Sequence, residues 1–354
     1  MAANNSTSLF NLGNLSSNAA KEPNRLVQAF TWFTIFTIIA TIAGNGLIIL
    51  AYITQRQLRT PFNLYIFYIA FLEALLAVTA MPGSFIQSFY GYWPFDAVSC
   101  SFVITARLVV GAAVRWGHTL IPANRIWAVT FPVHYRVAHT MRCATWLVVG
   151  SWIFLCAVCL PMVVLGRKSM GSAASDVKCQ RDNDGLYAEI IGFDLPEIII
   201  VLAFPYICFK LRRYRRLKRQ NKVLAHQSAV SDTMAMEKKA TRSSLPPSAA
   251  DPISPDPLGT AQPRSSPPQP RSGQSRSHFR IQTYLVIGII ICWTPNTVFW
   301  LLVDTTHPRY WNPTFNAVQF FLQYTYAWVS PLLCIAANRS IRQGVCDVLR
   351  CQRT

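Results

Sequence analysis

Residues 120–136 read LIPANRIWAVTFPVHYR, and this stretch decides how the rest of the sequence is interpreted. A largely apolar run precedes it, and Asn124 and Arg125 stand side by side where that run ends. The 354-residue chain is 52% hydrophobic and 14% charged, against about 25% charged residues in an ordinary soluble domain. The composition therefore predicts a membrane protein, in which Arg125 marks the point where an apolar helix leaves the lipid.

The formal net charge is +18, from 33 Lys and Arg against 15 Asp and Glu. Such an excess also occurs in nucleic-acid-binding proteins, where basic residues spread over one folded surface. Here the basic residues cluster between long apolar runs, which is the pattern of cytoplasmic loops in membrane proteins. We therefore expect no nucleic acid as a partner. No signal-peptide pattern follows Met1, so we expect the first apolar run to be retained.

Seven stretches are long and apolar enough to cross a membrane, since a crossing helix needs about 20 mostly apolar residues. Four of them contain no charged residue, and three contain a few. The sequence therefore predicts an all-α membrane protein, a seven-transmembrane helix bundle followed by a short cytoplasmic amphipathic helix. The predicted spans are Ala29–Ile53, Phe62–Phe85, Ser101–Ala123, Ala144–Gly166, Leu186–Phe209, Ile281–Val303 and Thr314–Ala337.

The positions of the basic residues indicate the orientation. Lys and Arg are frequent after the first, third and fifth spans and in the C-terminal tail, and scarce in the other connections. The segment after the fifth span reads KLRRYRRLKRQNK, residues 210–222. Because basic loops stay in the cytosol, we expect an extracellular N-terminus, a cytosolic C-terminus and a multi-pass location in the plasma membrane.

These spans divide the chain into five parts. Nine of the 22 prolines lie between Pro246 and Pro270, a composition that cannot bury enough apolar surface to fold. We therefore expect a disordered loop there, helical only at its basic ends. The parts are an extracellular segment 1–27, transmembrane helices one to five in 28–210, the disordered cytoplasmic loop 211–278, helices six and seven in 279–337, and a cytoplasmic amphipathic helix and tail in 338–354.

Two kinds of residue bear on the outer side of this topology. Asn4, Asn5 and Asn14 each begin an Asn-X-Ser/Thr acceptor sequence and are predicted glycosylation sites. Of ten cysteines, only Cys100 and Cys179 fall on the oxidising side, where disulfides persist. We expect these two to pair, joining the top of the third helix to the loop after the fourth.

The segment after Ala337, NRSIRQGVCDVLRC, is amphipathic when read as a helix. We expect it to lie along the inner membrane surface, with its arginines at the lipid head groups. Cys346 and Cys351 are either palmitoylation sites or plain thiols. The side chains expected to face the lipid are Ile341, Val345, Val348 and Leu349.

Together these features resemble the rhodopsin-like (class A) G protein-coupled receptors, over about Thr31 to Cys351 without the disordered loop. Each helix carries one landmark of that family. Segment 131–152, FPVHYRVAHTMRCATWLVVGSW, is most similar to the muscarinic and histamine receptors of the aminergic group. The landmarks are Gly44 with Asn45, LRTPFNLYI at 58–66, Asn124 with Arg125, Trp152 with Pro161, Pro196, CWTP at 292–295 and SPLLC at 330–334.

The resemblance implies a cell-surface receptor that transduces an extracellular small-molecule or peptide ligand to a heterotrimeric G protein. Membrane lipids are its other partner. No cofactor is expected, since the retinal of opsins needs a lysine in helix seven and none lies between Thr314 and Ala337. We expect no enzyme, because metal-ligand spacing such as His-Glu-x-x-His is missing from the sequence. Internal repeats, which are typical of transporters, are missing as well.

Arg125 occupies the place of the family's arginine that helps to receive the G protein. A guanidinium is always charged and has five N–H donors, which suits that role. The alternative is a plain cytoplasmic anchor. The resemblance also assigns G protein coupling and activation to Asn124, Pro295, Ser330 and Pro331, with Pro295 kinking helix six.

Several departures from the family pattern affect activation. Asn124 replaces the acid that restrains the arginine, and Ser275 near helix six is not an acid either. Ser330 and Cys334 replace the usual asparagine and tyrosine of helix seven. Losing the restraint favours the active state by up to a few kcal/mol, whereas losing the tyrosine weakens it. A constitutively active or non-signalling scaffold therefore stays the alternative.

Ionisable residues inside a spanning helix are costly and usually functional. Arg115 on helix three is expected to form an internal ion pair with Glu197 or Asp194 on helix five. Glu73 replaces the family's sodium-binding aspartate of helix two. It is expected either to bind sodium or to be a protonated, hydrogen-bonded glutamate. His118 belongs to a polar stripe of helix three that faces the bundle.

Arg107 stands where amine receptors carry the aspartate that holds the ligand's ammonium group. A guanidinium repels a cation and binds a carboxylate or phosphate with two hydrogen bonds. The sequence therefore favours an anionic or peptidic ligand, with an atypical amine receptor as one alternative. In another, Glu189 neutralises Arg107 and the receptor is ligand-independent. The other predicted ligand-binding residues form an aromatic cup: Gly111, Trp293, Asn296, Thr297, Trp300, Phe320 and Tyr324.

Overall fold

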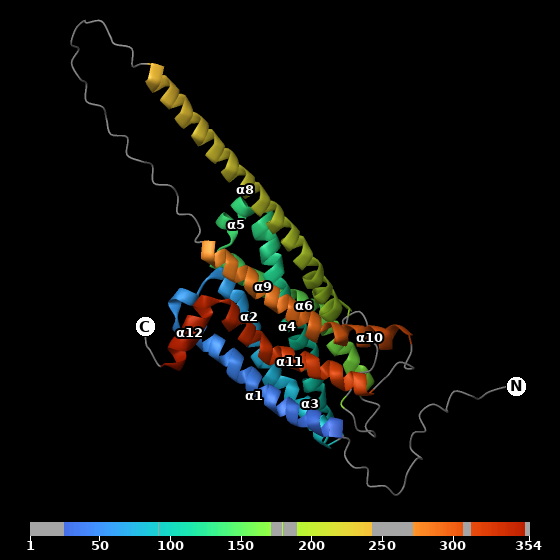
Figure 1. The fold of residues 1–354 in the computed structure, drawn as a ribbon. Coiled ribbons are helices and arrows are strands. Elements are labelled where there is room, and N and C mark those ends of the chain that lie inside the picture. Colours follow the sequence, from blue (N-terminus) through green and yellow to red (C-terminus); the bar gives the residue numbers. More distant parts are fainter. Residues whose placement is uncertain are drawn as a thin grey trace, which may run out of the picture.

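The computed structural model describes residues 25–90, 92–170, 179, 190–242, 272–306 and 313–350. Within these ranges, seven helical segments are long and apolar enough to span a membrane. They pack into an elongated bundle (Figure 1), which confirms the predicted architecture. The segments are Gln28–Thr54, Pro61–Tyr90, Ala97–Thr130, Met141–Cys159, Ile190–Asn221, Phe279–Leu302 and Val318–Ala337.

The helical elements are labelled in Figure 1. Most spans contain one long helix, and short elements connect or follow them. In chain order the elements are α1 Arg25–Thr54, η1 Arg56–Leu58, α2 Pro61–Thr79, α3 Met81–Tyr90, α4 Ala97–Thr130, α5 Pro132–Ala138, α6 Met141–Met170, η2 Ile190–Asp194, α8 Leu195–Arg242, α9 Ser272–Cys292, α10 Thr294–Thr306, α11 Pro313–Ala337 and α12 Arg339–Leu349.

Three spans are built from two elements each. The second span changes from α2 to α3 next to Pro82, and the sixth changes from α9 to α10 at Trp293. Pro295 has no N–H to donate to the preceding turn, which favours a kink or break in the helix at this point. The structure thus shows the predicted interruption beside Trp293. In the fifth span the π-helical turn η2 precedes α8.

The central helix is α4, which packs against α2, α6, α8 and η2. Its middle is formed by small residues, and Ala112 and Ala113 are fully buried. Small residues let helices approach closely in a membrane, where packing drives their association. At Gly111, a Cβ atom would lie only 3.2 Å from the Phe193 ring of η2. The glycine therefore allows Phe193 to reach the interior of the bundle.

Large apolar side chains cover the outside of the bundle, and polar side chains are held inside it. Trp32, Ile39 and Leu202 are 65%, 63% and 64% exposed, whereas Thr34 and Asn45 are buried. A soluble monomer rarely exposes so much contiguous apolar surface. The outer surface is therefore suited to lipid.

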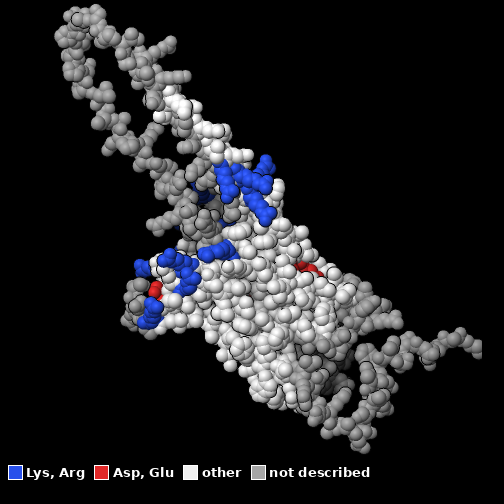
Figure 2. All heavy atoms as spheres, in the orientation of Figure 1, with Lys and Arg blue, Asp and Glu red and all other residues white. Residues whose placement is uncertain are grey.

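The two ends of the bundle differ in chemistry. Lys and Arg gather at one end, over α12 and the part of α8 beyond the bundle (Figure 2). At the start of α4 lies Cys100, which forms the predicted disulfide with Cys179 at a Cα–Cα distance of 5.5 Å. Arg125 lies near the other end of the same 34-residue helix. The disulfide and the basic cluster are therefore on opposite ends.

The fifth and sixth spans extend further than the sequence predicted. α8 continues without interruption to Arg242, and α9 begins at Ser272. Residues 211–242, assigned above to a disordered loop with helical basic ends, are therefore helical throughout. The repeated charged and alanine side chains of this segment favour helix even outside the bundle. Residues 243–271 lie outside the described part of the chain.

The amphipathic helix α12 follows the seventh span, but two of the four side chains assigned to lipid, Ile341 and Val345, face the bundle instead. Ile341 and Val345 are only 3% and 4% exposed and belong to the core of the bundle. Gly344 faces η1, where a Cβ atom would lie 2.7 Å from Leu58. Gln55 donates to the Gly344 carbonyl at 2.9 Å. The protein itself therefore covers this face, leaving Val348 half-buried and Leu349 exposed.

Candidate functional site

A cavity lies inside the bundle between α2, α4, η2 and α11, with Trp293 on its wall. It holds about 580 Å³ of empty space, open solvent included. Its walls are mainly apolar and aromatic with a few charged groups, as small-molecule sites commonly are. Five of the predicted ligand-binding residues line it, in company with Glu73 and Arg115: Arg107, Gly111, Trp293, Phe320 and Tyr324.

Arg107 places a positive charge on the cavity wall. Its Nη2 donates to the Ser84 hydroxyl at 2.8 Å, and that oxygen lies 2.7 Å from the hydroxyl of Tyr324. Its Nε is buried without a hydrogen-bond partner. No carboxylate in the described ranges lies within ion-pair distance of this guanidinium. Glu189, the predicted neutralising partner, lies outside the described residues.

Arg115, one of the largest fully buried side chains, lies deeper along α4. Its guanidinium carbon stands 4.5 Å from the Phe193 ring centre and 4.9 Å from that of Trp293. Its Nη2 donates to Oδ1 of Asn296 at 3.1 Å, and Asn296 donates in turn to Gln319. Aromatic faces stabilise a desolvated cation. Arg115 thus connects α4 with η2 and α10.

Glu197 is engaged by α10. The hydroxyls of Thr294 and Thr297 each donate to one of its carboxylate oxygens at 2.7 Å. Both carboxylate oxygens of Glu197 therefore have threonine hydroxyls as partners, and its ion pair with Arg115 stays a prediction. Asp194, the alternative partner, stays a prediction.

Two further predicted ligand-binding residues form hydrogen bonds between helices of the bundle. Asn296 and Thr297 hold Arg115 and Glu197, and neither is among the residues that line the cavity. Trp300 is half-buried on α10 and meets Phe299 edge-on at 5.3 Å. Its role in ligand binding stays a prediction.

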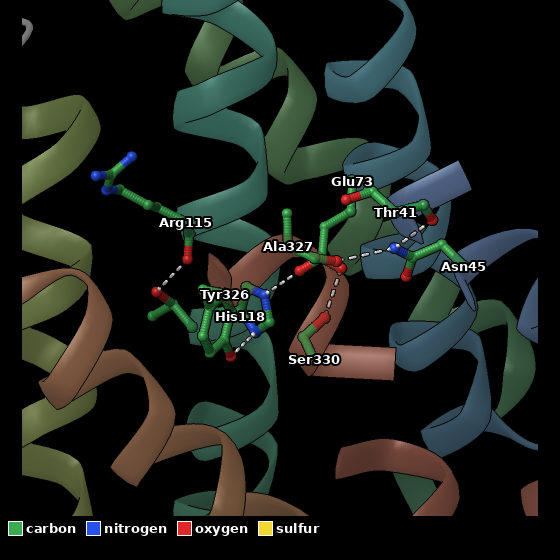
Figure 3. Close-up of polar contacts among 9 residues, drawn as sticks. Thr41, Asn45, Glu73, Arg115, His118, Tyr326, Ala327 and Ser330 are labelled. Atoms are coloured by element: carbon green, nitrogen blue, oxygen red, sulfur yellow. Dashed lines mark hydrogen bonds and ion pairs between the residues drawn. The ribbon is translucent and has the colours of Figure 1, made fainter. Parts of the chain in front are cut away.

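Figure 3 shows a polar cluster formed by Glu73 of α2, His118 of α4, and Tyr326 and Ser330 of α11. Oε1 of Glu73 lies 3.2 Å from Nε2 of His118, and the Ser330 hydroxyl donates to Oε2. The Tyr326 hydroxyl lies 3.5 Å from Nδ1 of His118. The side chains of Glu73 and His118 are each 1% exposed. Both carboxylate oxygens thus have a partner.

The groups around Glu73 do not fit a sodium ion well. Hard cations prefer several oxygen ligands, whereas one side of this carboxylate faces an imidazole nitrogen. The nearby Asn45 uses its Nδ2 to donate to the carbonyls of Ala327 and Thr41, each at 3.1 Å (Figure 3). Ser330 is the one described hydroxyl that contacts Glu73. Sodium binding stays a prediction that these contacts do not favour.

From the sequence, His118 was expected on an inward face of the third span, but its contact with Glu73 was not predicted. The two residues stand 45 positions apart, and their contact depends on how α2 and α4 are rotated against each other. The sequence feature that could have indicated this contact is an acidic and a basic residue in neighbouring apolar spans. His118 also meets the Trp293 and Tyr326 rings edge-on, each at 5.2 Å. It thus joins the cavity wall to Glu73.

At the basic end, no acid in the described part of the chain restrains Arg125. Its guanidinium carbon lies 4.9 Å from the Phe62 ring centre, and its Nε and Nη2 are buried without hydrogen-bond partners. Asn124, in the place of the family's acid, is buried. Among the described residues Arg125 forms no ion pair. The structure therefore agrees with the missing restraint inferred from the sequence.

An aromatic cluster that was not predicted from the sequence lies next to Arg125. The imidazole of His139 stacks on Tyr135 at 4.5 Å and lies 3.2 Å from the Tyr65 hydroxyl. Trp127 meets the His139 ring edge-on and donates from Nε1 to His134 at 3.0 Å. These contacts join the end of α4 to α2 and α5.

Burial first, and then the positive charge of Arg125, together lower the pKa of His139 from 6.5 to about 4. The folded protein therefore keeps this imidazole neutral, while the unfolded chain takes up a proton as the pH falls below 6.5. We expect the melting temperature of the detergent-purified protein to fall between pH 6.5 and about 4. His139→Gln should flatten that fall, whereas His134→Gln, at an exposed histidine, should not. An unchanged pH profile in His139→Gln would contradict this assignment.

Comparison with known proteins decides the family. The sequence profile described as "7 transmembrane receptor (rhodopsin family)" matches residues 44–336, most of the chain. The chain belongs to this family. It is therefore a G protein-coupled receptor, a multi-pass protein of the plasma membrane, as the resemblance implied.

Similar curated proteins include three alpha-2B adrenergic receptors. That of Elephas maximus is 26% identical over 270 residues, which cover 68% of this chain and 69% of the relative. That of Didelphis virginiana is 27% identical over 246 residues, or 67% and 62% of the two chains. That of Dugong dugon is 25% identical over 264 residues, with 68% of each chain covered. The receptor thus has aminergic relatives, and the narrower likeness to muscarinic and histamine receptors stays a prediction.

Several predicted modification sites are not tested by the structure. Asn4, Asn5 and Asn14 lie outside the described residues, as does Cys351. Cys346 is half-buried on α12, and its palmitoylation stays a prediction.

Proposed function

We propose that this receptor responds to an anionic ligand whose acid group binds Arg107 and whose apolar body fills the cavity toward Trp293. The observation that carries the proposal is the guanidinium of Arg107 on the cavity wall, hydrogen-bonded to a neutral hydroxyl. Ser84 and Tyr324 hold hydroxyl groups beside it. A carboxylate or phosphate would complete this set of donors.

The same geometry opposes an amine bound at this position. At an effective dielectric constant of 20, two like charges 4 Å apart repel by about 4 kcal/mol, enough to remove most ligand affinity. Aminergic relatives therefore do not make an amine the favoured ligand. The acid group can belong to a small molecule or to a peptide.

We infer that the basic end with Arg125 faces the cytosol and receives the G protein. Basic residues remain on the cytoplasmic side of membrane proteins, and disulfides form on the opposite side. The gathering of Lys and Arg at one end and the Cys100–Cys179 bridge at the other support an extracellular N-terminus.

Activation would connect these two ends through the interrupted sixth span. Trp293 lies on the cavity wall, contacts Arg115 and His118, and stands at the break between α9 and α10. A ligand pressing on this ring could change the bend at Pro295 and move α9 at the Arg125 end. Ser330 and Pro331 lie where α11 passes Glu73, so the seventh span would follow the same movement.

The test is a matched ligand series on cells that express the receptor. One set of aromatic and aliphatic bodies is offered as carboxylate, neutral amide and amine, and peptides are offered with free or amidated C-termini. G protein activation by carboxylates, and not by the matched amides and amines, is expected. Activation only by free-acid peptides would identify a peptide as the source of the acid group. Activation by the amines alone would refute the proposal.

A further inference from the structure

The contact between Glu73 and His118 determines how the buried carboxylate is stabilised. A carboxylate buried in the centre of a membrane bundle needs a counter-charge or hydrogen-bond donors. In this structure His118 approaches one oxygen and Ser330 donates to the other. The protein therefore supplies both partners from its own chain.

We propose that the imidazole of His118 holds the Glu73 carboxylate in place of a sodium ion, so that this bundle binds no sodium between α2, α4 and α11. The ring can donate to the carboxylate in two protonation states. A neutral imidazole with its proton on Nε2 donates to the carboxylate, and an imidazolium forms an ion pair with it. In both cases an N–H group points at the oxygen that a sodium ion would need.

The surroundings of His118 fix the ring in that position. Trp293 and Tyr326 both meet it edge-on at 5.2 Å, and Tyr326 places its hydroxyl 3.5 Å from the other ring nitrogen. Tyr326 is itself 1% exposed, and a Cβ atom on Gly288 would lie 2.9 Å from its ring. The imidazole therefore has little freedom to turn away from Glu73 and admit an ion.

The Glu73–His118 contact lies directly beside the ligand cavity. Glu73, Trp293 and Tyr326 all line the ligand cavity, and His118 touches each of them. A hydrogen-bond partner that is covalently part of α4 cannot leave on activation, whereas a bound ion can. The equilibrium between receptor states should consequently be independent of sodium concentration.

The test compares thermal unfolding of the purified full-length receptor in sodium chloride and in choline chloride at equal ionic strength. The wild-type melting temperature should be the same in both salts. In His118→Ser the ring is replaced by a hydroxyl oxygen ligand, and sodium chloride should raise the melting temperature by a few degrees, because an ion that binds only the folded state stabilises it. The rise should vanish in His118→Ser combined with Glu73→Gln.

Two results would overturn the proposal. One is a sodium-dependent rise in the wild type that Glu73→Gln removes, which would show that an ion binds beside the imidazole. The other is an unchanged melting temperature in His118→Ser, which would show that the ring is not what excludes sodium. Should His118→Ser not be recovered in folded form, His118→Asn offers an amide oxygen instead. Binding of radioactive sodium to the wild-type protein and to Glu73→Gln decides the question without any change at His118.

Discussion

Arg107→Asp is expected to lower the affinity for an acidic ligand by about two orders of magnitude or more. Removing one partner of a hydrogen-bonded charge pair in a binding site costs about 2–5 kcal/mol, and every 1.4 kcal/mol is tenfold in affinity. The new carboxylate would also repel the ligand's acid group. Arg107→Lys keeps the charge but loses the planar pair of donors, so it should weaken binding less.

The measurement is the concentration dependence of binding and G protein activation by the best carboxylate from the matched series. Surface expression of each variant is determined in parallel. Arg142→Asp is the matched control, since it makes the same exchange at an exposed arginine of α6 near the basic end. Equal affinity of wild type and Arg107→Asp, at equal surface expression, would place the acid group elsewhere.

Breaking the buried Glu73–His118 contact should have the second large effect, on stability. His118→Leu or Glu73→Leu leaves one buried polar group without its partner, which costs about 3 kcal/mol. Exchanging both for leucine removes both groups and should be close to neutral, because apolar replacement of a buried pair often is. We expect each single variant to melt well below the wild type and the double variant to recover most of the loss.

Thermal unfolding and surface expression of the four proteins measure this coupling. Thr119→Val, one position from His118 and with a hydroxyl that bonds only the backbone of its own helix, is a control for changes in this part of α4. Additive losses in the double variant would show that the two side chains do not stabilise each other.

The sequence predicted the architecture well because each membrane-spanning helix is indicated by residues close together in the chain. The length of an apolar run, the position of its basic flank and the proline at 295 act within one or two helical turns. The pairing of Cys100 with Cys179 also followed, since the topology left them as the two cysteines on one side. These inferences need no knowledge of how the helices face one another.

The contacts inside the bundle depend on helix rotation, and there the sequence was a weaker guide. Arg115 donates to Asn296 and Glu197 accepts from Thr294, so both side chains have partners on α10 that a search for opposite charges did not identify. Figure 3 shows Arg115 directed away from Glu73, whose partner is His118. Opposite charges in adjacent spans identify candidates for pairing, and rotation of the helices selects among them.

The assignment of α12 shows a different limit. An amphipathic pattern predicts that one face of the helix contacts an apolar surface, but it does not distinguish lipid from protein. Ile341 and Val345 pack on the bundle because Gly344 lets α12 approach Leu58 closely. The sequence feature that could have indicated packing on protein is Gly344, which has no side chain at the point of contact.

Agonist-free nucleotide exchange on purified heterotrimeric G proteins, catalysed by the receptor in lipid nanodiscs, tests the central claim most directly. Because Arg125 has no carboxylate partner among the described residues, the wild type should accelerate exchange above empty nanodiscs for at least one G protein class. Arg125→Ala should abolish this activity, and Asn124→Asp, which restores the restraining acid, should reduce it. Exchange that stays at the level of empty nanodiscs for every class, or that is unchanged in Arg125→Ala, would contradict a signalling receptor that acts through this end of α4.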